Sequence, residues 1–229
     1  MNLKDKIVVI TGASRGLGKE LALGFAKNEA KVVLVSKDKR ELKKVADEID
    51  GYPIACDVTN IQQVQELAEK VVKQFSRIDI WINDAGLWLP KATIEEIDTD
   101  RISELFEVNV FGLIYGSKQA FIQMKKQKNG TIINILSTIA LVANDMEAVY
   151  CASKWAVNGF TQSLRMGAIP HNIEVLSVFP GGMKTNFFDE AKPEAYGDFM
   201  EPASVASKII DNIKLDKPEE ELIIRRPKK

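Results

Sequence analysis

Short apolar runs alternate along the chain with longer stretches in which apolar residues recur every three or four positions. The short runs are apolar on consecutive residues, which is typical of strands in a parallel sheet covered by helices on both faces. The predicted strands are residues 7–10, 31–35, 53–56, 78–82, 131–136, 173–179 and 221–224.

The stretches between the strands have the spacing of amphipathic helices. The clearest follows Asn60, a side chain suited to capping a helix N-terminus, and its apolar positions are Ile61, Val64, Leu67, Ala68, Val71, Val72 and Phe75. Strands that alternate with such helices form repeated βαβ units. The pattern therefore predicts an α/β fold, a Rossmann-type doubly wound parallel β-sheet flanked by helices, as a single domain over residues 1–229.

One predicted helix, residues 101–118, is apolar around most of its circumference. Its apolar side chains are Leu105, Phe106, Val108, Val110, Phe111, Leu113, Ile114 and Tyr115. A helix of this kind is usually buried on most sides. Either the fold itself covers it, or a second subunit does.

Composition and charge narrow the class of protein. A formal net charge of -1 gives no electrostatic reason to expect nucleic acid or an anionic membrane as a partner. Cys56 and Cys151 are too few for a disulfide framework, and His171 has no companions for a metal site. No apolar run approaches the roughly 20 residues that cross a bilayer, and the first strand begins too early for a signal peptide. We expect a soluble cytoplasmic protein without a metal, whose basic tail, residues 225–229, is a solvated end.

A glycine-rich turn, TGASRGLG, follows the first predicted strand and opens a helix. Gly12 would allow the tight turn, Gly16 a close approach of backbone to pyrophosphate, and Gly18 close packing of the helix on the strand. The helix N-terminus would offer free N–H groups and the positive end of its dipole to phosphate. This context favours a nucleotide site over an ordinary turn, and Ser14, Arg15 and Leu17 belong to the same expected site.

The TGxxxGxG spacing resembles that of the classical short-chain dehydrogenase/reductase family, and further elements are similar to the family's pattern over about residues 5 to 185. These elements are Asp57 with Val58, the Asn83-Asp84-Ala85-Gly86 turn, Asn109, Ser137, the Tyr150-x-x-x-Lys154 pair, and the segment from Pro180 to Thr185.

The resemblance implies a nicotinamide-dependent oxidoreductase with Asn109, Ser137, Tyr150 and Lys154 as its catalytic set. It implies that Asp57 contacts the adenine ring, that Lys154 also holds the ribose, and that Asn109 positions a water in a proton relay. The residues it places around the cofactor also include Val58, Asn83, Ala85, Gly86, Pro180, Gly181, Met183 and Thr185.

The Tyr150–Lys154 spacing has a chemical use. Reducing a ketone requires a hydride for the carbonyl carbon and a proton for its oxygen; a cofactor brings the hydride, so the protein must supply orientation and an acid. Two residues four apart on a helix share a face, and a nearby ammonium lowers a tyrosine pKa. Ser137 would hold the substrate oxygen where charge develops. We therefore expect a ketone or aldehyde reductase, in which Tyr150 becomes the base in the oxidative direction.

Two cations bear on the choice of nicotinamide cofactor. Asp38 lies near the spacing at which an acid binds the ribose 2′-hydroxyl of NAD. In the family that the chain resembles, however, the deciding acid aligns with Ser36, and a basic residue at the position of Lys37 pairs with the 2′-phosphate. Arg15 matches another basic position of NADP users. NADP(H) is therefore favoured, and NAD(H) stays possible.

The chain departs from the family pattern in two places. Asp84 replaces an asparagine and puts a possible negative charge beside the cofactor turn. The chain also lacks, after Ile224, the glycine-rich tail of many tetrameric members. This favours a homodimer through the helices of residues 101–118 and 150–167, with a tetramer as the alternative.

Loops at the carboxyl ends of the strands are expected to form the substrate site. They contain Trp88 and Leu89, residues 141–147, and residues 186–200. The last of these segments resembles the family's substrate-covering loop. The aromatic side chains of that loop either favour an apolar small-molecule substrate or pack beneath the loop. Two other functions stay open: a 3-oxoacyl-(acyl-carrier-protein) reductase, and a nicotinamide sensor without turnover, which the complete catalytic set disfavours.

Overall fold

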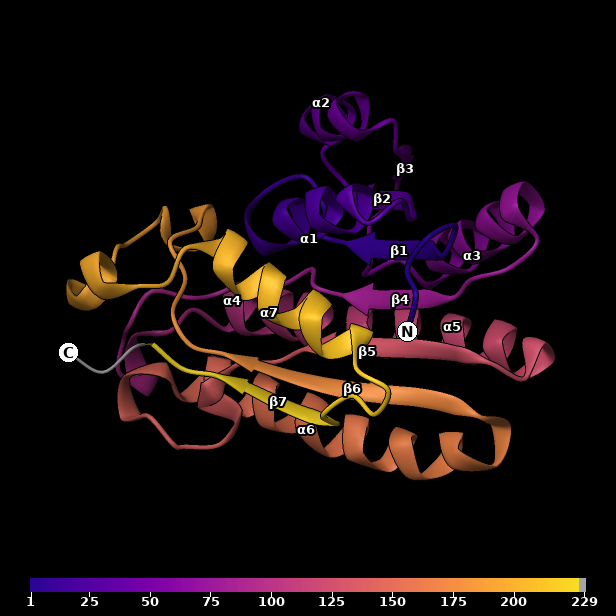
Figure 1. Cartoon of the computed structure of the whole chain (residues 1–229). Helices are drawn as coiled ribbons and strands as arrows, with labels where there is room; N and C mark the ends of the chain where they lie inside the picture. The colour runs from indigo at the N-terminus through magenta and orange to yellow at the C-terminus, as the bar shows by residue number, and fades with distance from the viewer. Residues whose placement is uncertain (227–229) are drawn as a thin grey trace.

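The computed structural model describes residues 1–226, in which seven strands form one parallel sheet of order β3-β2-β1-β4-β5-β6-β7 (Figure 1). The strands are β1 (Ile7–Thr11), β2 (Lys31–Ser36), β3 (Tyr52–Ala55), β4 (Ile80–Asn83), β5 (Gly130–Ile135), β6 (Ile173–Pro180) and β7 (Glu221–Ile224). The predicted fold class, a doubly wound parallel sheet flanked by helices, is confirmed.

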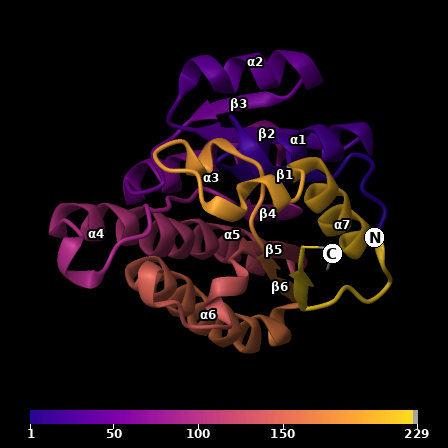
Figure 2. The ribbon, with the colours of Figure 1, turned by 90° about the vertical axis from the view of Figure 1, so that its left-hand side faces the viewer.

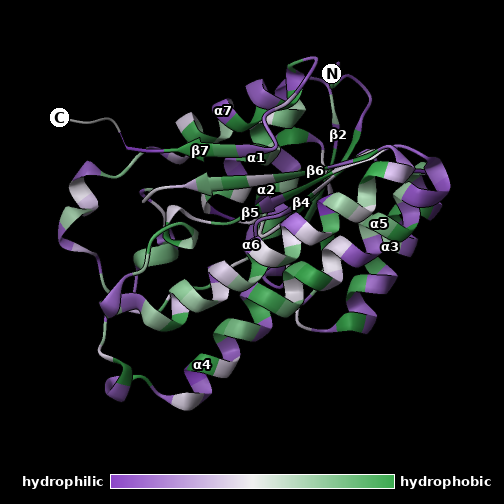
Figure 3. Ribbon diagram, turned by 90° about the horizontal axis from the view of Figure 1, so that it is seen from below, coloured by the Kyte–Doolittle hydropathy of each residue, from purple (hydrophilic) through white to green (hydrophobic). Residues whose placement is uncertain are grey.

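Helices cover both faces of the sheet (Figure 2). On one face lie α1 (Gly16–Lys27), α2 (Lys39–Ile49) and α7 (Pro202–Lys214). On the other lie α3 (Ile61–Phe75), α5 (Leu113–Gln127) and α6 (Ala148–Ala168), with α4 (Thr99–Phe106) leading into α5. Figure 3 shows hydrophobic positions along α5 and α6, seen from the side that these helices cover.

Strand β1 explains why the strands are apolar on consecutive residues. Val8 and Ile10 belong to the core cluster under α1, α2 and α7. Ile7 and Val9 belong to the cluster under α3, α5 and α6. Side chains alternate between the two faces of a strand, so a sheet covered on both sides needs an apolar residue at every position.

The bounds of β4 differ from the prediction at the start of the strand. The side chain of Gln127 accepts a hydrogen bond from the Ile78 N–H at 3.0 Å and donates one to the Ile78 carbonyl at 2.8 Å. The backbone groups of Ile78 are thus satisfied by a side chain of α5, and the strand begins at Ile80.

The predicted helix over residues 101–118 is interrupted by a π-helical turn, Glu107–Gly112, between α4 and α5. Leu105, Val110 and Leu113 are buried, whereas Phe111 is 41% exposed. Of the two alternatives for this apolar helix, the fold itself accounts for most of the covering.

The carboxyl ends of the strands meet at one edge of the sheet. From β1 the chain proceeds outward to β3 and then crosses back to β4, so that the ends of β1 and β4 lie side by side at a reversal of strand order. Open α/β sheets bind ligands at such a reversal. Figure 1 shows the segment between β6 and α7 folded over this edge. Within residues 1–226, no helix is both long and apolar enough to cross a membrane.

Candidate functional site

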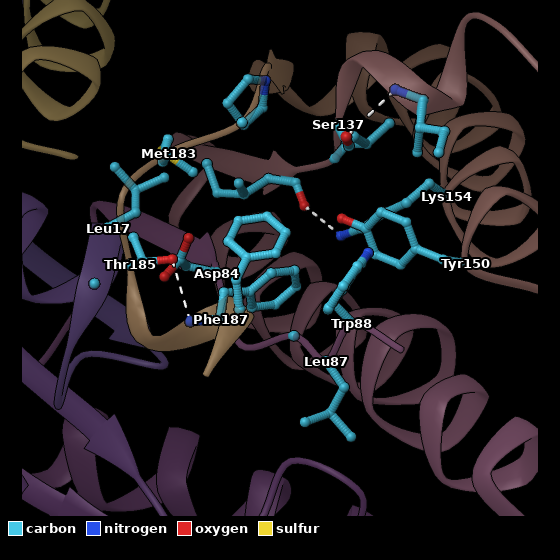
Figure 4. Close-up of a pocket in the computed structure, with 18 of the residues that line it drawn as sticks. Leu17, Asp84, Leu87, Trp88, Ser137, Tyr150, Lys154, Met183, Thr185 and Phe187 are labelled. Atoms are coloured by element: carbon cyan, nitrogen blue, oxygen red, sulfur yellow. Dashed lines mark hydrogen bonds between the residues drawn. The ribbon is translucent and has the colours of Figure 1, made fainter. Parts of the chain in front are cut away.

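A cavity of about 830 Å³ opens at the carboxyl ends of the strands. It extends from the glycine-rich turn after β1 to the first turns of α6. Figure 4 shows Leu17, Asp84 and Thr185 on one side, with Ser137 and Tyr150 across from them. Its volume is within the range of about 300–1,000 Å³ that is usual for ligand pockets.

The glycine-rich turn has the geometry that its spacing predicts. Gly12 and Gly16 have φ angles of +74° and +57°, in the left-handed region that favours glycine. A Cβ on Gly18 would lie 2.4 Å from the carbonyl oxygen of Gly12. The absence of a side chain at Gly18 therefore lets α1 begin close against the end of β1.

The first turn of α1 is open to an anion. Its N-cap residue, Arg15, makes no side-chain capping hydrogen bond, and Gly16 and Leu17 line the cavity. A helix N-terminus attracts negative charge through its free N–H groups and its dipole. Together with the glycine cradle, this turn fits the pyrophosphate of a dinucleotide.

The end of β2 presents a cation to the same cavity. The Oγ atoms of Ser14 and Ser36 are 3.0 Å apart, which joins the glycine-rich turn to β2. Lys37 and Arg15 line the cavity. Asp38 does not, because its Oδ1 caps α2 by accepting hydrogen bonds from the N–H groups of Arg40 and Glu41, each at 3.1 Å.

Asp57 and Val58 contribute the wall beyond β3. The Oδ1 atom of Asp57 accepts hydrogen bonds from the N–H and the hydroxyl of Thr59, at 3.0 and 2.8 Å. These bonds fix the carboxylate at the edge of the cavity.

Ser137 and Tyr150 come together from β5 and α6. Ser137 follows the end of β5, and Tyr150 lies in the first turn of α6. Burial raises the pKa of Tyr150 above its usual range; the hydrogen bond with Ser137 acts the other way, and the negative charge of Glu147 adds to the rise. The lowering of the Tyr150 pKa that the sequence led us to expect from Lys154 is therefore wrong for this state, because burial prevails.

Lys154 lies one turn further along α6. Its Nζ donates to the Ile135 carbonyl at 3.2 Å and lies 5.8 Å from the centre of the Tyr150 ring. Burial lowers the pKa of Lys154 to about 8, and the negative charge of Asp84 opposes that shift.

Asp84 is the departure that the sequence analysis singled out, and it is half-buried in the cavity wall. Burial raises the pKa of its carboxyl to about 7, while Lys154 and a hydrogen bond from the Gly18 N–H lower it. Asp84 thus connects the first turn of α1 electrostatically to the ammonium of α6.

Three of the predicted site residues, Gly18, Asn83 and Asn109, do not line the cavity. Asn83 is buried, and its amide bonds Trp81, Ser117 and Asn134, which ties β4 to β5 and α5. This amide therefore braces the sheet beneath the cavity.

Asn109 lies in the π-helical turn. Its side chain accepts from the Leu87 N–H at 2.7 Å and donates to the Leu87 carbonyl at 2.9 Å. Both polar ends of the amide thus hold the loop after β4. Asn109 does not line the cavity itself, but it fixes Leu87, which does.

The other predicted site residues all line the cavity. They are Gly12, Ser14, Arg15, Gly16, Leu17, Ser36, Lys37, Asp57, Val58, Ala85, Gly86, Ser137, Tyr150, Lys154, Pro180, Gly181, Met183 and Thr185. They come from the ends of β1 to β6 and from the loops and helices that follow these strands, so the fold gathers motifs that are far apart in the sequence.

Aromatic side chains of the segment from residue 186 to 200 close the cavity. The ring of Phe188 packs edge-on against Trp88, with centroids 4.9 Å apart, and that of Phe187 against Tyr150 at 6.2 Å. Phe187, Phe188 and Phe199 line the cavity, whereas Tyr196 packs against Phe188 and Phe199. The aromatic residues thus both pack beneath the segment and form a cavity wall.

Several lining residues were missed by sequence reasoning. Arg225 and Arg226 line the cavity, and the guanidinium of Arg226 lies 5.0 Å from the centre of the Phe199 ring. The basic tail was expected to be only a solvated end; Arg225 and Arg226 are exposed, and they also line the cavity because β7 ends beside β6 there. Residues 227–229 lie outside the described part. Lys91 also lines the cavity and carried no motif that identified it, and Glu147, the last residue of the expected substrate loop 141–147, lines it without having been singled out.

Comparison with known proteins agrees with this geometry. A family profile described as "short chain dehydrogenase" matches residues 6–195. An uncharacterized oxidoreductase of Staphylococcus saprophyticus is 34% identical over 98% of this chain and 97% of its own. A 3-oxoacyl-[acyl-carrier-protein] reductase of Thermotoga maritima is 31% identical over 92% of this chain and 91% of its own.

Among solved structures, a 3-ketoacyl-(acyl-carrier-protein) reductase of Brucella melitensis complexed with NADH superimposes with a TM-score of 0.91 at 25% identity, covering 97% of each chain. The sequence matches and the structural superposition therefore lead to the same family as the motifs that line the cavity. The chain belongs to the short-chain dehydrogenase/reductase family of oxidoreductases.

Proposed function

We propose that the chain is an NADP(H)-dependent oxidoreductase that transfers a hydride between the nicotinamide and a carbonyl or alcohol substrate. One observation carries the proposal: a single cavity contains the glycine-rich turn, the Ser137 and Tyr150 hydroxyls and the Lys154 ammonium. The bound nicotinamide would supply the hydride. The residues that would hold the cofactor are those of the glycine-rich turn, the end of β2 and the segment after β6.

The chain's own residues supply orientation and the proton. The Ser137 hydroxyl holds the substrate oxygen, and Tyr150 passes its phenolic proton to that oxygen during reduction. A raised pKa keeps Tyr150 in its protonated form before substrate arrives. An ammonium favours the phenolate that remains, and Lys154 lies one helical turn away to supply it.

Asn109 and Lys154 complete the proposed set. Asn109 fixes the loop after β4 through both polar ends of its amide, and the family resemblance gives it a further role with a relay water. Lys154 has to carry a positive charge, and Tyr150 has to give up a proton. Such a pair, in which burial shifts the pKa values of two neighbouring groups in opposite directions, is typical of an acid–base site.

The cofactor preference rests on two cationic side chains, Arg15 and Lys37, and on the carboxylate of Asp38, which already caps a helix. Arg15 and Lys37 are exposed, line the cavity and form no ion pair with another described residue. The carboxylate of Asp38 is used as a helix cap. A 2′-phosphate would find two cations near the end of β2, which supports NADP(H) over NAD(H).

The replacement Lys37→Ala tests this preference. We expect it to weaken NADPH binding at least tenfold, on the order of one charge-assisted hydrogen bond, and to change NADH binding little. Fluorescence titration measures both affinities, and Lys39→Ala, at an exposed α2 position outside the cavity lining, is the matched control. Equal losses for NADPH and NADH would remove the basis for the preference.

The substrate class is proposed as a small ketone or aldehyde, in a soluble cytoplasmic homodimer that needs no nucleic acid, membrane or metal. The Thermotoga maritima relative keeps a second candidate open, a reductase of 3-oxoacyl thioesters. The cations Lys91, Arg225 and Arg226 at the cavity favour that candidate, because a carrier-bound substrate brings a phosphate.

The proposal is tested by following NADPH oxidation with ketones, aldehydes and 3-oxoacyl thioesters, with NADH in parallel. Turnover of at least one class with NADPH is the expected result, and the preferred class decides between the two candidates. Tight NADPH binding without turnover on any class would contradict the enzyme proposal and favour a sensor.

A further inference from the structure

A carboxylate that no motif identified is fixed in the wall of the cavity. Glu147 immediately precedes α6, three residues before Tyr150, and lines the cavity. Its Oε1 accepts a hydrogen bond from the indole N–H of Trp88, and its Oε2 accepts one from the amide of Asn144, both at 2.7 Å. Each oxygen is thus held in place by one neutral donor.

These donors leave the negative charge of Glu147 without a counter-ion. It forms no ion pair with any residue that the structure describes. A carboxylate oxygen has two lone pairs, so each Glu147 oxygen can accept a second hydrogen bond. Glu147 and Tyr150 line the same cavity from the start of α6, and the negative charge of Glu147 adds to the raised pKa of Tyr150.

Aromatic rings lie beside the groups next to Glu147. Trp88, which donates to the carboxylate, packs against Phe188, and Tyr150, three residues further along the chain, packs against Phe187. Figure 4 shows Trp88 and Tyr150 on the same side of the cavity. A charge beside apolar walls is less screened than one in water, so it discriminates between substrates by charge and by hydrogen-bond donors.

We propose that Glu147 is a specificity-determining residue that selects carbonyl substrates with a hydroxyl or ammonium group next to the reacting carbon. The donor of the substrate bonds the free lone pairs of the carboxylate while the carbonyl oxygen meets Ser137 and Tyr150. A substrate with a carboxylate at that position is repelled. This inference rests on the proposed function, since it names the substrate class of the same site.

Four phenyl ketones of one frame test the inference, with a methyl, hydroxymethyl, aminomethyl or carboxylate group on the carbonyl carbon. We expect kcat/KM with NADPH to be at least tenfold higher for the hydroxymethyl or aminomethyl ketone than for the carboxylate ketone, the size of a charge-assisted hydrogen bond. The aminomethyl and hydroxymethyl members distinguish a cationic donor from a neutral one.

The variant Glu147→Gln should reduce this ratio by about tenfold, because the amide is neutral. Glu147→Asp keeps the negative charge but shortens the side chain by one methylene, which moves the carboxylate away from the substrate. This variant should still reject the carboxylate ketone but no longer prefer the hydroxymethyl ketone to the methyl ketone. Asp145→Asn is the matched control: it removes one charge from the same turn at an exposed residue that does not line the cavity. It should keep the wild-type ratio.

Calorimetric binding of the same ketones separates this inference from the proposed reaction. Donor-selective binding that Glu147→Gln abolishes, without turnover of any ketone, would support the role of Glu147 and contradict the reductase. The inference would be overturned if the wild type bound and reduced the hydroxymethyl, aminomethyl and carboxylate ketones equally well. It would also be overturned if a folded Glu147→Gln variant kept the wild-type selectivity among these ketones.

Discussion

At the scale of single residues, burial governs the chemistry of the site. Tyr150 and Lys154 are 8% and 5% exposed, and burial shifts their pKa values in opposite directions. The sequence placed both on one helix face, yet it could not reveal how deeply they are buried or that Lys154 donates to the Ile135 carbonyl. Spacing identifies such partners, whereas their protonation depends on packing by elements remote in sequence.

Asp84 should make stability depend on pH. Its pKa in the folded protein is about 7, against an ordinary value of 3.8, so between these values the folded state holds a proton that the unfolded chain has released. The free energy of unfolding therefore falls as pH rises through this window. Relative to wild type, Asp84→Asn should gain about 2–3 kcal/mol more at pH 7 than at pH 5, from about 1.4 kcal/mol per pKa unit.

Urea unfolding of both proteins at the two pH values measures this difference. The control is Asp50→Asn, which removes a carboxylate at an exposed position. A constant difference between Asp84→Asn and wild type would show that Asp84 is ionised throughout.

At the scale of elements, hydrophobic periodicity predicted the strands and helices well, and it failed where side chains intervene. The early start predicted for β4 is wrong because Gln127 bonds the backbone of Ile78. The π-helical turn that contains Asn109 was not predicted, because one extra residue in a turn changes the apolar spacing too little to be seen.

The close contact between the glycine-rich turn and α1 gives a test at this scale. Gly18→Ala would place a Cβ 2.4 Å from a backbone oxygen, so we expect a loss of about 1–3 kcal/mol and weaker binding of NADPH. Gly197→Ala is the control, since a Cβ there has no neighbour within 4 Å and should change the free energy of unfolding by less than about 0.5 kcal/mol. Thermal unfolding measures both, and equal melting temperatures would contradict the packing role of Gly18.

At the scale of the whole molecule, long-range folding creates what sequence reasoning missed. The residues of the recognised motifs were predictable because each motif is local. Lys91, Arg225 and Arg226 were not, because only the closure of the loops and the place of β7 beside β6 bring them to the cavity. Glu147 lies in the expected substrate loop 141–147, but the bonds from Trp88 and Asn144 that fix its carboxylate could not be predicted. Exposed apolar residues also lie on α5 and α6 or directly beside these helices: Phe111, Ile122, Trp155, Met166 and Ile169.

The proposed dimer interface is formed by the helices of residues 101–118 and 150–167. Met166 is 75% exposed, so Met166→Glu costs little in a monomer but buries a charge in a dimer. Light scattering should give twice the chain mass of 25.5 kDa for the wild type and a lower mass for the variant. Leu215→Glu, which follows α7 on the other side of the sheet, should leave the dimer intact; its dissociation instead would place the interface there.

The variant Tyr150→Phe tests the proposed reaction most directly, when it is measured for NADPH binding and for reduction of the best carbonyl substrate. The change removes one hydroxyl and leaves the ring that packs against Phe187. We expect binding to be retained and kcat to fall at least about 100-fold, the lower bound for a lost general acid. Turnover at the wild-type rate would contradict the assignment of Tyr150 as the proton donor, and with it the proposed function.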